Sequence, residues 1–257
     1  MISFKKPLLI IGHPGHELRA FKFIKDYKPD AVIITDGSGS QHSSRIANSI
    51  KILDSLGSRC INLFNPFTDK EIYDFILNEN IRAIGKIRDI ILNEVLTQGY
   101  DLLIGDALEG FNPTHDLCRY IINSVVKKAN LENRDYAIKN ISYKLDSVSS
   151  IKSNLISDES VFNFFLSEKE FNEKYTAALN YPELQFELDK AIQLYGKDAF
   201  MNEEYEVVED IEMISNWSTP CPFYENYGKE KVRDGIYQHS IEFEKHMKPI
   251  AMTLLNT

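Results

Sequence analysis

Two histidines and a glutamate lie within five positions near the start of the chain, in the stretch LLIIGHPGHE. His13 and His16 are three residues apart, and they follow a run of apolar residues that ends in a glycine. Imidazole nitrogens bind zinc and related metals, and a nearby carboxylate can act as a general acid or base. Because H-x-x-H is a weak pattern by itself, its meaning depends on what the fold brings beside it.

Two further stretches place polar side chains directly after apolar runs. AVIITDGSG supplies Asp36, and DLLIGDALEGFNPTHD supplies Asp106, Glu109 and His115. The carboxyl ends of parallel strands meet at one edge of a sheet, where ligands bind. If the strands are parallel, three histidines and several carboxylates converge there, which favours a zinc site. The alternative interpretation of His115 is a polar residue in the first turn of a helix.

Apolar runs alternate with segments of helical spacing over the first 145 residues. The runs lie at 7–12, 31–35, 60–64, 102–105 and 138–145, and the helical segments lie at 16–27, 41–56, 69–97 and 114–130. Short apolar strands separated by amphipathic helices are typical of βαβ units. The predicted fold class is therefore α/β: a Rossmann-like three-layer fold with a mostly parallel sheet.

The pattern changes after about residue 150. Segment 157–196 has helical spacing, and Pro182 divides it into two helices. Residues 202–213 are predicted as a strand or a solvated loop, 217–235 as an ordered loop over a cleft, and 229–255 as a last helix bent near Gly235 or Pro249. We expect residues 1–150 to form the core with the metal site, and residues 151–257 to add a helical C-terminal region packed on the same domain.

The bulk composition limits the partners and the compartment. The 38 acidic and 29 basic residues give a net charge of −9, which disfavours binding to nucleic acid or an anionic membrane. No apolar run approaches the roughly 18 residues of a membrane span, and the first residues lack the features of a signal peptide. The three cysteines are far apart and give no disulfide framework. These features predict a cytoplasmic protein.

The stretches LLIIGHPGHE, AVIITDGSG and DLLIGDALEGFNPTHD occur in an order that resembles the PIG-L/LmbE-like family of zinc-dependent N-deacetylases. The family's motifs are H-P-D-D-E after a strand, then T-D-G, then H-P-D-H at a helix start. Its members act on N-acyl amino sugars attached to inositol, lipid or nucleotide groups. The resemblance covers about residues 7–130. It implies an LmbE-like fold, Zn²⁺ as the cofactor and a small amino-sugar or nucleotide-sugar substrate.

The resemblance also implies roles for individual residues. By position, the family's metal ligands fall on His13, His16 and His115, so that three histidines replace a set of two histidines and an aspartate. Arg45 matches the arginine that follows T-D-G and could bind a phosphate or a sugar hydroxyl. A surface arginine on a polar helix face is the alternative interpretation of Arg45.

The chain departs from the family's pattern at the catalytic positions. The family's general base, the first aspartate of H-P-D-D-E, is Gly15 here. The histidine that opens the third motif is Asn112, and the aspartate of that motif is Thr114.

Other acids near the rim are candidates to replace the missing base. They are Glu17, Asp36, Asp106 and Asp116. The alternatives are a structural role for Glu17, and orientation of the imidazoles by Asp36 and Asp106. Asn112 could donate a hydrogen bond to an oxyanion.

Three hypotheses follow for the function. The first is a zinc-dependent, N-deacetylase-like amidohydrolase that removes an acyl group from an N-acyl amino sugar or its nucleotide- or lipid-linked form. The second is a family descendant without the standard base, acting as a sugar- or nucleotide-sugar-binding or group-transfer protein in polysaccharide biosynthesis. The third is a non-enzymatic α/β binding module. In the first two, aromatic and basic residues of the predicted loop 217–235 could form a lid over an anionic sugar donor: Tyr224, Tyr227, Lys229, Lys231 and Arg233.

Overall fold

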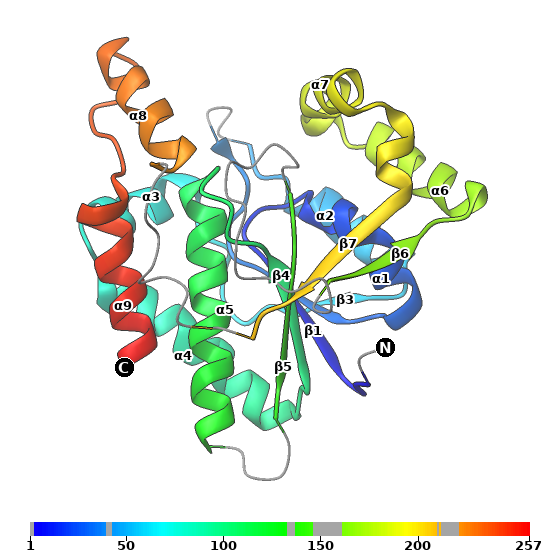
Figure 1. The fold of residues 1–257 in the computed structure, drawn as a ribbon, viewed down its shortest axis with the longest axis horizontal. Helices are drawn as coiled ribbons and strands as arrows, with labels where there is room; N and C mark the ends of the chain where they lie inside the picture. The colour runs from blue at the N-terminus through cyan, green and yellow to red at the C-terminus, as the bar shows by residue number, and fades with distance from the viewer. Residues whose placement is uncertain (1–2, 40–42, 133–136, 146–160, 210, 212–220) are drawn as a thin grey trace.

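A computed structural model describes residues 3–39, 43–132, 137–145, 161–209, 211 and 221–257. Within these residues the chain forms one seven-stranded sheet of order β3-β2-β1-β4-β5-β7-β6 (Figure 1). The strands are β1 (Pro7–Ile11), β2 (Asp30–Ile33), β3 (Arg59–Cys60), β4 (Leu102–Asp106), β5 (Lys139–Tyr143), β6 (Val161–Phe165) and β7 (Asn202–Val207). The first five are parallel, as the alternating sequence pattern predicted, and the α/β fold class is confirmed.

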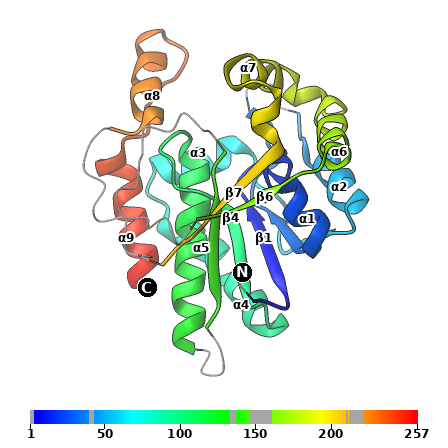
Figure 2. The ribbon, with the colours of Figure 1, turned by 45° about the vertical axis from the view of Figure 1, so that its right-hand side comes forward.

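Helices cover both faces of the sheet (Figure 2). They are α1 (Phe21–Tyr27), α2 (Ile46–Ser55), α3 (Asp69–Leu77), α4 (Ile81–Gln98), α5 (Pro113–Glu132), α6 (Glu168–Leu179), α7 (Gln185–Tyr195), α8 (Phe223–Arg233) and α9 (Lys248–Asn256). Helices α3, α4, α5 and α9 pack on one face, and α1 and α2 pack on the other.

The central strand β1 explains why its sequence is a continuous apolar run. All five of its residues are buried. Leu8 and Ile10 join the core beneath α4 and α5, whereas Leu9 and Ile11 join the core beneath α1 and α2. A strand covered on both faces has no polar side to alternate with the apolar one. The same reasoning applies to β4, which pairs with β1 in parallel and is also entirely buried.

The C-terminal region adds strands as well as helices. Strands β6 and β7 extend the sheet as an antiparallel pair beyond β5. The prediction of helix throughout 157–196 is therefore wrong for 161–165, and residues 157–160 lie outside the described part. In β6, Phe162 and Phe164 contact Tyr205 of β7. The aromatic residues of this segment recur in the sequence at near-helical spacing, which is why a helix was predicted there. The predicted break at Pro182 is confirmed, because α6 and α7 flank it.

The last part of the chain also differs from its prediction. Residues 223–233 form helix α8 and not a loop, while 212–220 lie outside the described residues. The predicted helix over 229–255 is interrupted between α8 and a single π-helical turn, η7 (Phe243–Met247), and this break contains Gly235. The proposed boundary at residues 150 and 151 also lies outside the described part.

Glu203 of β7 ties the C-terminal region to the first helix. Its carboxylate accepts hydrogen bonds from the backbone N–H groups of Lys22 and Phe23, at the start of α1, and from the Lys174 ammonium at 2.8 Å. It also accepts the Tyr205 hydroxyl at 2.8 Å. Glu203 and Lys174 are 3% and 6% exposed. A buried carboxylate that lies 180 positions later in the sequence than Phe23 therefore caps the N-terminus of α1.

The strand order places a crevice between β1 and β4. The chain leaves β1 towards β2 on one side, and it leaves β4 towards β5 on the other. The loops that follow β1 and β4 therefore diverge, and ligands bind at this switch point in open α/β sheets. The sequence HPGHE follows β1, and the residues from Ala107 to the start of α5 follow β4.

No helix in the described residues is long and apolar enough to cross a membrane.

Candidate functional site

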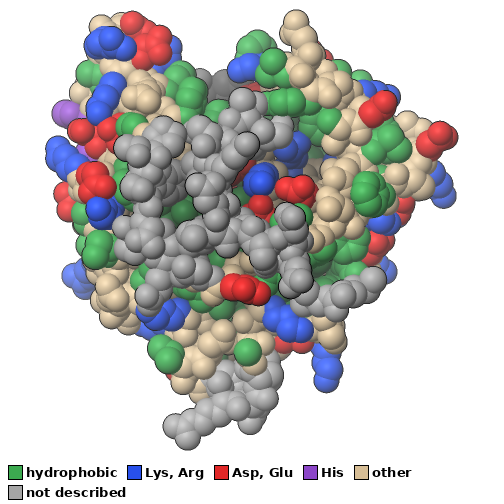
Figure 3. Space-filling model, in the orientation of Figure 1, with side chains coloured by type: hydrophobic (Ala, Val, Ile, Leu, Met, Phe, Trp, Pro, Cys, Tyr) green, Lys and Arg blue, Asp and Glu red, His purple; other side chains and the backbone are tan. Residues whose placement is uncertain are grey.

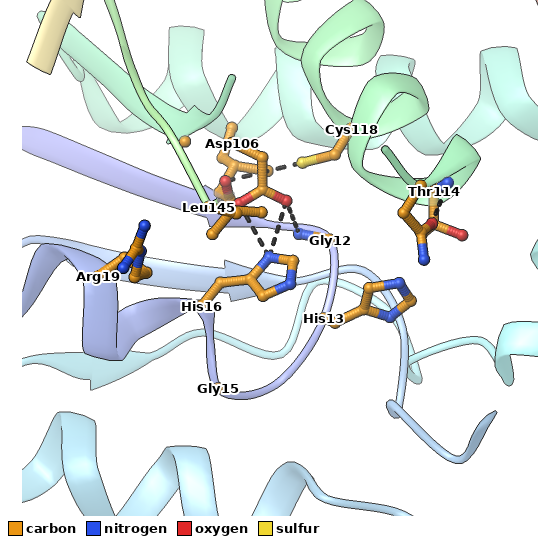
Figure 4. Close-up of polar contacts among 12 residues, drawn as sticks. Gly12, His13, Gly15, His16, Arg19, Asp106, Thr114, Cys118 and Leu145 are labelled. Atoms are coloured by element: carbon orange, nitrogen blue, oxygen red, sulfur yellow. Dashed lines mark hydrogen bonds and ion pairs between the residues drawn. The ribbon is translucent and has the colours of Figure 1, made fainter. Parts of the chain in front are cut away.

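The Asp106 carboxylate holds the loop after β1 against the end of β4 (Figure 4). Asp106 is fully buried; its Oδ2 accepts the backbone N–H of Gly12 at 2.8 Å, and the carboxylate lies 2.9–3.0 Å from His16 Nδ1. A Cβ atom on residue 12 would lie 2.9 Å from Asp106 Oδ2, so the approach requires a glycine. With Nδ1–H of His16 assigned as the donor to the carboxylate, Nε2 of His16 carries the free lone pair.

His13 is fixed in a similar way. Its Nδ1 lies 2.7 Å from Thr35 Oγ1 and 3.1 Å from Asp69 Oδ1. Because the Thr35 hydroxyl donates its hydrogen to Gly12 O at 2.9 Å, His13 Nδ1 is assigned as the donor to Thr35. Burial favours the protonated form of Asp69, but its contacts with His13 and with the backbone N–H of Gly39 outweigh burial and hold the pKa of Asp69 well below its usual range. Nε2 of His13 is therefore also free to act as an acceptor or ligand.

His115 lies in the first turn of α5 and completes a cluster of three imidazoles. Its ring centroid is 4.4 Å from that of His16 and 5.0 Å from that of His13, and the His13 and His16 centroids are 5.4 Å apart. The rings pack edge to face. Nδ1 of His115 is buried and has no hydrogen-bond partner among the residues that the structure describes. The three side chains therefore lie close together, as the sequence predicted.

Burial favours the neutral form of two imidazoles of this cluster, those of His16 and His115. Burial lowers the pKa of His16, although the charge and hydrogen bond of Asp106 act in the opposite direction. Burial and the neighbouring charges of His16 and His13 lower the pKa of His115 well below its ordinary value. Across the described residues, however, no three His, Cys, Asp or Glu side chains are arranged around a common point as metal ligands.

Glu17 stabilises the loop after β1 through hydrogen bonds of its carboxylate. Its Oε2 accepts the backbone N–H of Gly15 at 2.8 Å, and its Oε1 accepts the Ser49 hydroxyl at 2.7 Å. Its side chain is fully buried, and burial raises the pKa of Glu17 against the opposing effect of these hydrogen bonds. The contacts of Glu17 are those of a residue that shapes the turn, which is the structural role weighed for it from the sequence.

A residue of the C-terminal region occupies the space beside Gly15 that a side chain would need. Its φ angle is +103°, which favours glycine, and a Cβ atom there would lie 2.5 Å from Leu184 Cδ1. Leu184 belongs to the 3₁₀ turn η4 (Pro182–Leu184) just before α7. The same turn is anchored to α2, because Asn48 Nδ2 donates to Glu183 Oε2 at 2.9 Å. Methyl groups therefore fill the volume that a side chain at position 15 would need.

The remaining predicted site residues have local partners. Asp36 accepts the backbone N–H of Ser38 at 2.9 Å, within the turn after β2. Asn112 Oδ1 accepts the Thr114 N–H at 2.8 Å and so caps α5. In Arg45 the guanidinium donates to Gly37 O at 2.5 Å.

Arg45 still acts on the cluster through its charge. The positive charge of Arg45 contributes to lowering the pKa of His16 and of His115, and it opposes the raised pKa of Glu17. Its guanidinium is thus close enough to influence any anion bound in the crevice.

Asp69 is a site residue that the sequence analysis missed. It is the first residue of α3, whose N-cap Thr68 forms a capping box with Glu71. The chain reaches this point through a parallel bridge between Thr35 and Phe67, beside the end of β2. The sequence FNPFTDKE signals the start of a helix, because Thr68 and Glu71 have the spacing of a capping box. It does not mark Asp69 as a site residue, because β3 ends at Cys60, nine residues before it.

The predicted lid residues lie on α8 and not on a loop. They include Tyr224, which is buried, and Tyr227, which is 41% exposed. Helix α8 begins beside the loop after β4, since the Tyr224 N–H donates to Gly110 O at 3.2 Å. In the space-filling view, the molecule is notched between the lobes that carry α8 and α7 (Figure 3).

The structure resembles solved structures of deacetylases. It aligns with a triple mutant of a deacetylase of the teicoplanin biosynthetic pathway with a TM-score of 0.53, at 13% sequence identity, covering 80% of this chain and 99% of that one. It aligns with the deacetylase of the antimicrobial A40926 pseudoaglycone with a TM-score of 0.52, at 14% identity, covering 80% and 97% of the two chains. No family model and no curated protein matches the sequence. At such identities the likeness is one of fold.

Proposed function

We propose that this protein is a zinc-dependent amidohydrolase that removes an acyl group from an N-acyl amino sugar or from its nucleotide- or lipid-linked form. The observation that carries the proposal is the cluster of His13, His16 and His115 at the switch point of the sheet. The fold shared with two deacetylases supports the same class of reaction.

The donor set fits zinc in its chemistry. In His13 and His16, Nδ1 faces a carboxylate, of Asp69 and Asp106 respectively, in the arrangement that orients metal-binding histidines in proteins. His115 adds a buried nitrogen that has no partner in the described part of the chain, which is the kind of atom that a bound ion satisfies. Binding requires the three rings to turn from their edge-to-face packing so that their free nitrogens meet. Zinc bound there would supply a Lewis acid and a water molecule of lowered pKa.

Proton transfer needs a carboxylate that reaches the crevice. Glu17 is engaged by Gly15 and Ser49, and Asp106 is fully buried between Gly12 and His16. The Asp69 side chain contacts His13 and is 15% exposed. Among the described carboxylates that contact the three histidines, we therefore assign the proton-accepting role to Asp69, because its side chain is partly exposed.

A second candidate function is binding of a sugar or nucleotide sugar without hydrolysis. The observation that favours it is Leu184, whose methyl carbon fills the place beside Gly15. A site whose base position is closed by an apolar side chain could retain the ligand and lose the reaction. Arg45 would serve such a protein as the partner of a phosphate or a sugar hydroxyl.

Metal analysis tests the site first. Protein purified without chelators is expected to carry about one zinc ion per chain, and His16→Ala is expected to lose it. His239→Ala is the matched control, because His239 is an exposed histidine far along the chain from the cluster. Unchanged zinc content in His16→Ala, or loss of zinc in the control, would contradict the proposed ligand set.

Release of free amine from N-acetylglucosamine and from UDP-N-acetylglucosamine then tests the reaction. The wild type is expected to release amine, and Asp69→Asn is expected to lower kcat about 100-fold or more while zinc is retained. If the wild type binds zinc and UDP-N-acetylglucosamine but releases no amine, the binding function replaces the hydrolase.

A further inference from the structure

A row of exposed aromatic side chains leads away from the site along α8. Phe111, in the loop after β4, stacks on Phe223 with centroids 5.2 Å apart and planes 8° apart. Phe223 stacks on Tyr227 at 5.8 Å, and Tyr227 meets Tyr237 edge to face at 6.5 Å. The four side chains are 40%, 49%, 41% and 41% exposed in chain order. We call these four residues the aromatic ridge.

The stacking leaves part of each ring exposed. Carbon atoms in contact lie about 3.5–4.0 Å apart. A centroid distance of 5.2 Å between nearly parallel rings therefore requires Phe111 and Phe223 to slip sideways by roughly 3–4 Å, so that only their edges overlap. Phe223 and Tyr227 are offset in the same way. The ridge is thus a staircase of partly open aromatic faces.

The ridge is continuous with the candidate site. Phe111 directly precedes Asn112, which caps the helix that carries His115. Burial raises the pKa of Tyr73 on α3, and the charges of Tyr237, Asp69 and Tyr227 raise it further, so this phenol interacts electrostatically with both regions.

We propose that the aromatic ridge binds further sugar rings of a glycan whose N-acyl amino sugar lies at the three histidines. This inference rests on the proposed function and names the form of its substrate: an oligosaccharide or glycoconjugate, and not a free monosaccharide. One face of a pyranose presents C–H groups of partial positive charge, which are attracted to the negative face of an aromatic ring. Tyr227 and Tyr237 add hydroxyl groups at the edge of the rings.

Charges around the ridge favour a sugar over an alkyl chain. The Lys231 ammonium lies 5.1 Å from the centroid of the Tyr227 ring, and Lys229 and Glu225 form an ion pair on the same helix. An alkyl chain lying here would desolvate these charges without pairing them, whereas sugar hydroxyls can hydrogen-bond to them.

The exposed area argues against a protein partner. At roughly 250 Å² or less for each aromatic side chain, four rings exposed by less than half offer under about 500 Å². A stable protein interface buries about 800 Å² on each partner, whereas a patch of the smaller size is typical of a ligand subsite.

Calorimetric titration of the purified full-length protein with the β-1,4-linked tetramer of N-acetylglucosamine, and with the monosaccharide, tests the ridge. The wild type is expected to bind the tetramer about tenfold or more tightly than the monosaccharide. The double variant Phe223→Ala/Tyr227→Ala is expected to bind both equally, with unchanged affinity for the monosaccharide. Phe223→Tyr/Tyr227→Phe keeps the rings and is expected to restore the preference. Phe186→Ala on α7 is the control, because Phe186 is 78% exposed and lies outside the ridge.

Four results would overturn the inference. These are an equal affinity of the wild type for the two sugars, an unchanged preference in the double alanine variant, an equal loss in Phe186→Ala, and displacement of the tetramer by octanoate. Failure of the proposed function gives a different result. If no amine is released but the preference for the tetramer still depends on Phe223 and Tyr227, sugar binding by the aromatic ridge is supported and the proposed hydrolase activity is contradicted.

Discussion

The two sides of the crevice between β1 and β4 differ in how completely their buried polar side chains are hydrogen-bonded. Residues 12–23, which we call the braced side, follow β1, and residues 112–116, which we call the open side, begin α5. On the braced side, Gly12 N, Gly15 N and Nδ1 of both histidines have polar partners. On the open side, Thr114 Oγ1, His115 Nδ1 and Asp116 Oδ2 are buried without a hydrogen-bond partner within the described residues.

The difference indicates that the braced side is structural and that the open side can gain hydrogen bonds from a ligand. An unbonded buried polar atom costs about 1–3 kcal/mol, so the open side holds free energy that a ligand can recover. The braced side holds no such reserve, because its polar atoms are already hydrogen-bonded. A site with one fixed and one unsatisfied wall binds its ligand without moving the strands that carry it.

The largest expected effect tests the Glu203 carboxylate, which caps α1 at the end of the braced side. Glu203→Gln removes the charge that pairs with buried Lys174 and caps α1, and we expect it to lower the free energy of unfolding by about 3–5 kcal/mol. Urea denaturation measures the change. Glu173→Gln is the control, because Glu173 pairs with Lys25 at the surface, where their side chains are 41% and 33% exposed. It is expected to cost less than about 1 kcal/mol. Equal losses would show that the brace contributes no more than a surface pair.

Asp106→Asn is expected to have the next largest effect. The substitution keeps the shape but turns a carboxylate that accepts from Gly12 and faces His16 into a group with only one acceptor. We expect a loss of about 2–3 kcal/mol in unfolding free energy and a roughly 10–100-fold weaker affinity for zinc. Asp36→Asn is the control, since Asp36 accepts one hydrogen bond within its own turn. A smaller change in Asp106→Asn than in the control would be inconsistent with this assignment.

Gly12→Ala tests the closest approach on the braced side. The added Cβ would lie 2.9 Å from Asp106 Oδ2, and we expect a loss of about 1–3 kcal/mol from the displaced carboxylate. Gly85→Ala provides the control in helix α4, where nothing lies within 4 Å of the added atom. That change is expected to stabilise the protein by up to about 1 kcal/mol. Thermal denaturation of the two variants should shift in opposite directions.

A pair of identical substitutions compares the two sides directly. Thr35→Val and Thr114→Val each remove a hydroxyl from a residue that is at most 1% exposed. Thr35 lies beside the braced side and bonds to His13 and Gly12, so its loss is expected to cost about 1–2 kcal/mol. The Thr114 hydroxyl has no hydrogen-bond partner within the described residues, so its removal is expected to change stability by less than about 0.5 kcal/mol or to raise it. A similar loss in both variants would remove the distinction between the sides.

The braced side could be predicted from the sequence further than the open side. The apolar runs fix the parallel strands, because strands buried on both faces carry no other pattern. Once the strands are parallel, His13, His16, Asp106 and His115 must meet at one edge. Asp69 was missed because its place depends on the Thr35–Phe67 bridge, which pairs single residues and leaves no periodic signal.

The C-terminal region could be predicted less well for a physical reason. The aromatic residues of β6 pack on Tyr205, and in the sequence their spacing runs on into that of α6. Leu184 could not have been linked to Gly15, since 169 positions separate them and an apolar residue in a helical turn carries no sign of its contact. The three unbonded atoms of the open side are equally invisible to sequence patterns, because whether a buried atom has a partner depends on distances in the folded chain.

The cap that Glu203 provides for α1 has a consequence for the order of folding. The backbone N–H groups of Lys22 and Phe23 receive their acceptor from a residue about 181 positions later. During synthesis the loop with the two histidines therefore leaves the ribosome long before the strand that secures it, and contacts of such separation form slowly. We expect the parallel strands to assemble first in refolding, and binding competence to appear only when β7 joins the sheet edge.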